Sequence, residues 1–151
     1  MGRGGAAVGA DVSPQTARAA RVALDLVLIA AATLGAMKLF ELGLQQLAGT
    51  TFWKTWTAEH SGAGRLVPAL PIAVACGLLP GLVLGGFAGS RAWLLACWAG
   101  AAVVVLDLGA MIVADGPAGV LTAFALAPLC VALGLPVGAA LGTKLMPAPA
   151  K

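Results

Sequence analysis

Four polar residues could do chemistry within long apolar stretches of this chain: Lys38, Glu41, Gln45 and Asp107. Lys38, Glu41 and Gln45 recur at intervals of three and four residues, which places them on one face of a helix. Asp107 stands alone in a later run of Ala, Val and Leu. Ionisable residues inside membrane helices are typical of solute and ion pathways. We call this set the candidate polar cluster.

Lys38 and Asp107 are expected at the same depth, because each lies about 15 residues, or ~23 Å of helix rise, from the inner end of its helix. Asp107 then needs a hydrogen-bond donor, and Lys38 is the available cation, for which Glu41 competes. An alternative stays open. Lys38 and Glu41 could extend to the outer headgroups while Asp107 is protonated or bonded to a neighbouring helix.

Glu59 and His60 form a second pair with chemical potential, in a less hydrophobic segment. Adjacent residues point apart on a helix, and no nucleophile or oxyanion site of recognisable spacing accompanies them. His60 is the only histidine, and the three cysteines, Cys76, Cys97 and Cys130, lie singly in apolar runs. The sequence therefore predicts no catalytic residues, no metal site and no cofactor, and argues against an enzyme.

The composition indicates an integral membrane protein. Of the 151 residues, 60% are hydrophobic and 10% are charged, and the mean hydropathy is +0.98. Soluble domains carry about 25% charged residues. At roughly 20 residues per span, the chain has room for about four transmembrane helices. The predicted fold is an all-α bundle with spans at 22–44, 66–89, 92–114 and 118–143, between tails at 1–21 and 144–151.

A short interfacial helix is expected between the first two spans, at residues 51–60. Trp53 and Trp56 accompany charged residues there, as in the aromatic belts of membrane proteins. We interpret both tryptophans as interfacial anchors, with residues 61–64 as the return to the second span. A ligand site in this segment is the alternative interpretation.

Glycines recur every fourth residue in two of the predicted spans. The first stripe contains Gly77, Gly81, Gly85 and Gly89, and the second contains Gly134, Gly138 and Gly142. A four-residue interval places each set on one helix face, where the lack of side chains lets another helix approach closely. Alignment of Gly81 with Gly134 also suggests an internal duplication of two helical hairpins.

The basic residues predict the orientation of the chain. With both termini in the cytoplasm, six of them lie inside and only Lys54 and Arg65 lie outside. Asp25 is expected to contact Arg21 one turn earlier on the same helix. The inside set is Arg3, Arg18, Arg21, Arg91, Lys144 and Lys151. Since these residues are scattered singly, the net charge of +3 does not indicate nucleic-acid binding. The predicted location is a bacterial cytoplasmic membrane.

Two functions remain open from the sequence. The first is a non-catalytic subunit or scaffold, in which the glycine stripes mediate packing within the bundle or against a partner. That partner would be a second copy of the chain or another membrane protein. The alternative is a small solute or ion transporter or channel that uses the candidate polar cluster.

Overall fold

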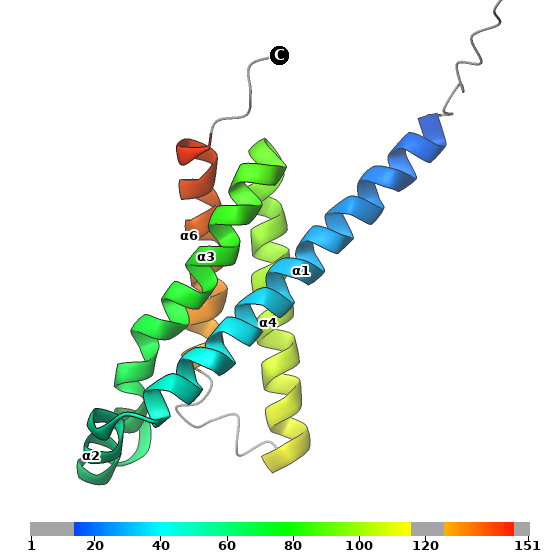
Figure 1. The fold of residues 1–151 in the computed structure, drawn as a ribbon. Helices are drawn as coiled ribbons and strands as arrows, with labels where there is room; N and C mark the ends of the chain where they lie inside the picture. Colours follow the sequence, from blue (N-terminus) through cyan, green and yellow to red (C-terminus); the bar gives the residue numbers. More distant parts are fainter. Residues whose placement is uncertain (1–13, 116–125, 147–151) are drawn as a thin grey trace, which may run out of the picture.

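The computed structural model describes residues 14–115 and 126–146, and every regular element in these ranges is helical (Figure 1). Three helical stretches are long and apolar enough to cross a membrane: Pro14–Ala48, Gly64–Val113 and Leu126–Leu145. The predicted all-helical class is confirmed to that extent. In chain order the elements are α1 (Pro14–Ala48), α2 (Thr51–Glu59), the 3₁₀ helix η1 (Gly62–Ala69), α3 (Leu70–Ala88), the 3₁₀ turn η2 (Gly89–Arg91), α4 (Ala92–Asp115) and α6 (Leu126–Leu145).

Helix α1 contains 35 residues and crosses α3 and α4 obliquely (Figure 1). It begins at Pro14, eight residues before the predicted first span, so residues 14–21 and the span form one helix of about 52 Å. Its buried residues are Ala32, Thr33 and Ala36. The Thr33 hydroxyl lies 3.3 Å from the Ala99 carbonyl oxygen of α4. Small side chains thus let α1 and α4 approach closely where they cross.

Asp25 pairs with Arg91 and not with Arg21, which corrects the expectation from the sequence. Arg91 Nη1 donates to Asp25 Oδ2 at 2.8 Å. Because α1 lies across the turn between α3 and α4, a cation distant in sequence reaches the carboxylate. This ion pair fixes α1 to η2.

The two glycine stripes face each other across the contact between α3 and α6. A Cβ added to Gly77 would lie 3.0 Å from the Gly134 Cα, and one added to Gly142 would lie 3.0 Å from the Gly85 Cα. Val74 and Leu78 carbonyl oxygens of α3 lie against Gly134 and Gly138. Residue numbers rise together in the two helices, so α3 and α6 run parallel. Backbone packs directly on backbone here.

The structure sets the register in which the two stripes meet. Gly134 lies against Gly77, and Gly142 lies against Gly85. A pattern that repeats every four residues looks the same after a four-residue shift, so the sequence could not fix this register. The alignment of Gly81 with Gly134 compared two segments as copies of one hairpin, so the spatial contact does not test it.

Gly89 lies outside this contact. It caps the C-terminus of α3 with φ +56°, and a Cβ added to it would meet nothing within 4 Å. The left-handed backbone allows the chain to turn from α3 into α4, a conformation that glycine adopts without strain. Its place in the four-residue series is therefore a requirement of the turn, and it is not a packing residue.

The segment between α1 and α3 largely follows the prediction. Helix α2 ends at Glu59, one residue before the expected end, and the Thr50 hydroxyl accepts a hydrogen bond from Trp53 N at 3.2 Å. A 3₁₀ helix replaces the expected flexible return and continues to Ala69. The predicted start of the last span at residue 118 and the end of the C-terminal tail lie outside the described residues. The described part of that helix begins at Leu126.

Substitution of Gly85 tests the contact between α3 and α6. Gly85→Leu is expected to lower the free energy of unfolding by about 1 to 3 kcal/mol, because its side chain would overlap backbone atoms of α6. Thermal unfolding in detergent measures this change. Gly109→Leu is the matched control, since a Cβ at Gly109 meets nothing within 4 Å. Equal melting temperatures for the two variants would contradict the packing.

Candidate functional site

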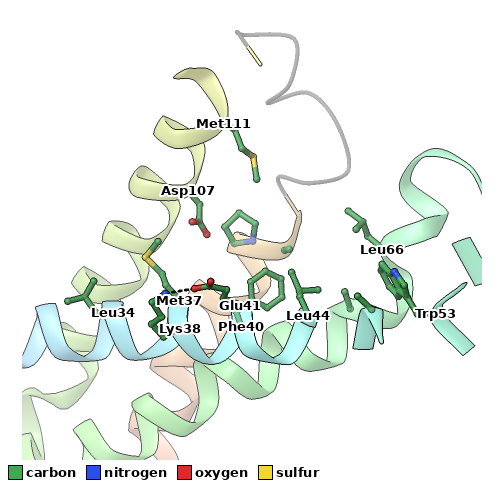
Figure 2. Close-up of a pocket in the computed structure, with 14 residues that line it drawn as sticks. Leu34, Met37, Lys38, Phe40, Glu41, Leu44, Trp53, Leu66, Asp107 and Met111 are labelled. Atoms are coloured by element: carbon green, nitrogen blue, oxygen red, sulfur yellow. Dashed lines mark hydrogen bonds and ion pairs between the residues drawn. The ribbon is translucent and has the colours of Figure 1, made fainter. Parts of the chain in front are cut away.

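The main candidate site is a cavity of about 590 Å³ between α1, α2, η1, α4 and α6 (Figure 2). Most of its walls are apolar, and three ionisable side chains lie among them. The complete lining is Leu34, Met37, Lys38, Phe40, Glu41, Leu44, Ala48, Trp53, Leu66, Ala69, Asp107, Met111, Ala127 and Pro128.

Three members of the candidate polar cluster line this cavity: Lys38, Glu41 and Asp107. Gln45 does not line it. It shares a helix face with Lys38 and Glu41, but its side chain is exposed and lies outside the lining. The spacing on α1 therefore predicted a shared helix face for the three residues, and it could not show that the cavity reaches only Lys38 and Glu41.

Lys38 donates to Glu41 Oε2, so the expected pair between Lys38 and Asp107 is wrong. The three-residue interval on one helix brings the ammonium and the carboxylate together without any tertiary contact. The Lys38 and Glu41 side chains are 74% and 51% exposed, respectively. They therefore form the open side of the cavity.

Asp107 projects from α4 into the cavity, towards the helix that carries Lys38 and Glu41 (Figure 2). The carboxylate is half-buried, and no ion pair or hydrogen bond joins it to another residue in the described ranges 14–115 and 126–146. A carboxylate in apolar surroundings is costly unless a charge or a donor compensates it. Asp107 is accordingly the polar group of this cavity that is free to meet a ligand.

The two predicted anchor tryptophans occupy different environments. Trp53 forms part of the cavity wall. Trp56 stacks on His60, with ring centroids 3.8 Å apart, and its Nε1 donates to the Gly64 carbonyl oxygen at 2.9 Å. These contacts hold α2 against the start of η1. The sequence offered a ligand site in this segment only as the alternative interpretation, and it could not place Trp53 in a cavity because the other walls come from distant segments.

The described contacts of the His60 imidazole are with Trp56, one turn earlier in the chain. His60 Nδ1 lies 3.0 Å from the Trp56 carbonyl oxygen, and the imidazole ring is stacked on the indole. No group of three or more His, Cys, Asp or Glu residues in the described part of the chain could hold a metal ion. The imidazole therefore contributes to the packing of α2.

Neither a protein family, nor a curated protein, nor a solved structure matches this chain. The site is therefore interpreted from its own residues and geometry.

Double-mutant cycles test the assignment of ion pairs in the cavity. Lys38→Ala and Asp107→Ala are expected to change the free energy of unfolding additively, within about 0.5 kcal/mol, because the two side chains do not pair. Lys38→Ala and Glu41→Ala should show a coupling of about 0.2 to 1 kcal/mol, as exposed pairs do. Denaturation in detergent micelles measures both cycles. A coupling above ~1 kcal/mol between Lys38 and Asp107 would restore the pairing predicted from the sequence.

Proposed function

We propose that this chain is a small multi-pass membrane protein that binds a solute in the cavity lined by Lys38, Glu41 and Asp107. The observation that carries the proposal is the uncompensated Asp107 carboxylate in an otherwise largely apolar cavity of about 590 Å³. Pockets of 300–1,000 Å³ with a few polar groups are typical small-molecule sites. Since no nucleophile or metal group accompanies the carboxylate in the described residues, the proposed role is binding without catalysis.

In this proposal α1, α3, α4 and α6 all span the membrane, with both termini in the cytoplasm of a bacterial cell. The parallel course of α3 and α6 supports this arrangement, because it brings Arg91 and Lys144 to the same end. The ion pair with Asp25 brings the start of α1, with Arg18 and Arg21, to that end as well. A basic end is expected on the cytoplasmic side. The cavity would then lie in the outer half of the membrane.

Reporter fusions test this topology. A fusion after Lys151 is expected to be active only with a cytoplasmic reporter, and a fusion inserted at Gly62 only with a periplasmic one. Alkaline phosphatase and green fluorescent protein are suitable as reporters. An active phosphatase at the C-terminus would contradict the proposed topology, and the fusion at Gly62 would then distinguish a wrong number of spans from a reversed orientation.

The glycine stripes no longer favour a scaffold. Gly77, Gly85, Gly134 and Gly142 are used in the contact within the chain, so they offer no free seam to a partner. A subunit role stays a second candidate because of α1, whose large apolar side chains are mostly exposed. Val22, Leu26 and Val27 are examples. Either lipid or another membrane protein would cover this face of α1.

A variant that fills the cavity tests the proposed function. Ala48 lines the cavity, and Ala48→Trp is expected to deplete any small molecule that copurifies with the wild-type protein. Ala30→Trp is the matched control, because Ala30 is exposed on the same helix and does not line the cavity. Mass spectrometry of extracts from the three purified proteins gives the comparison. Identical extracts from both variants and the wild type would contradict solute binding in this cavity.

Flux in proteoliposomes then distinguishes a transporter from a binding protein. A transporter is expected to move the identified solute faster than protein-free vesicles, and Ala48→Trp should abolish the difference. A pulldown from the native membrane tests the subunit role in parallel. A stable protein partner that is retained by Ala48→Trp, without solute binding by the wild type, would favour that second candidate.

A further inference from the structure

The charges of the cavity define which solutes it can accept. Its ionisable lining residues are one cation, Lys38, and two carboxylates, Glu41 and Asp107. Lys38 is already bonded to Glu41. With all three groups ionised the cavity therefore carries one negative charge, located at Asp107. An anionic solute would meet repulsion there, whereas a cation would compensate the carboxylate.

The walls around Asp107 favour an organic cation over a metal ion. Ca²⁺ needs six to eight oxygen ligands, and Mg²⁺ needs six in octahedral geometry, partly from water. The lining offers two carboxylates, and Glu41 is already engaged by Lys38. Phe40 and Trp53 supply aromatic rings, which attract cations, and methionine side chains such as Met111 adapt to irregular apolar shapes.

We propose that the cavity binds an amphipathic, monovalent organic cation, with its charged group beside Asp107 and its apolar part among Phe40, Trp53 and Met111. This inference rests on the proposed function and names its solute class. The exposed Lys38 and Glu41 side chains mark the open side by which the solute enters. Asp107 is the specificity-determining group, since it is the carboxylate of the cavity that no other described residue compensates.

Binding of this cation competes with a proton for the same carboxylate. Lys38 and Glu41, both on α1, are the other charged groups that face Asp107 in the cavity. The parts of α2, η1 and α6 that line it contribute apolar side chains. Protonation of Asp107 removes the charge that the cation needs, so the affinity falls as the pH is lowered.

Two tetraphenyl ions of nearly equal size and opposite charge test the proposal. Tetraphenylphosphonium is the cation and tetraphenylborate the anion, and equilibrium dialysis measures their binding to the full-length protein in phosphatidylcholine nanodiscs. We expect saturable binding of the cation at pH 8, at least tenfold weaker binding at pH 4, and no binding of the anion above that of empty nanodiscs.

Variants locate the site. Asp107→Asn is expected to weaken binding of tetraphenylphosphonium at least tenfold, and Asp107→Glu should retain it. Glu59→Gln is the matched control, because it removes the same charge from an exposed residue of α2 that does not line the cavity. The cation should also change the tryptophan fluorescence of the wild type, and Trp53→Phe should remove that change while Trp93→Phe keeps it.

Several outcomes would overturn the inference. They are equal binding of the two ions, wild-type affinity in Asp107→Asn, and binding of the cation that does not depend on pH. If Asp107→Asn fails to fold, the comparison of the two probe ions and the pH dependence of binding to the wild type decide the question. If neither ion binds while Ala48→Trp still depletes a copurified solute, the cation class is wrong and solute binding stands. If Ala48→Trp also has no effect, both proposals fall.

Discussion

The contact between the backbones of α3 and α6 is the constraint on which the rest of the structure depends. Carbonyl oxygens of each helix lie against glycines of the other, from Gly77 and Gly134 at one end to Gly85 and Gly142 at the other. Such an approach is available only where side chains are absent, and it allows weak Cα–H···O contacts along the whole interface. In a membrane, where apolar side chains gain little by leaving lipid, this close packing supplies much of the stabilisation.

The cavity follows from how the other two long helices meet this pair. Helix α4 returns beside it, and α1 crosses over α3 and α4 obliquely (Figure 1). Small residues, including Ala36 and Ala99, are buried in the chain interior and permit close approach at the crossing. Beyond the crossing, α1 continues towards α2 while α4 diverges from it, and the cavity lies between them (Figure 1). That space is lined on α1 by residues such as Lys38, Glu41 and Ala48, and on α4 by Asp107 and Met111.

The acidic residues of the long helices are compensated unequally. Arg91 pairs with Asp25 from another helix, and Lys38 pairs with Glu41 on its own helix. Asp107 has no such partner in the described part of the chain. A carboxylate in a medium of low dielectric constant must be neutralised by a proton, a donor or a cation. This inequality is why the solute, and not a second side chain, is proposed to complete the site.

The sequence by itself determined the helical class, the apolar stretches and the short helix with Trp53 and Trp56. It also showed which polar residues lie within the apolar stretches. These properties follow from local composition and periodicity, which act within a few turns of one helix. The sequence also indicated that Gly85 meets another helix, because a stripe without side chains has a use only at close approach. Its four-residue repeat could not fix the register of the two stripes, nor show that Gly89 serves the turn.

Only the tertiary structure decided which charges pair and which share a space. Asp25 pairs with Arg91 because α1 lies against η2, a turn that is distant in sequence. Asp107 shares a cavity with Lys38 and Glu41 because α1 and α4 diverge beyond their crossing. The pair between Lys38 and Glu41 was available from spacing alone, yet the choice between Glu41 and Asp107 as the partner of Lys38 depended on the distance between two helices. Crossing angles and interhelical distances arise from the sum of many side-chain contacts, so they cannot be derived from the periodicity of any one segment.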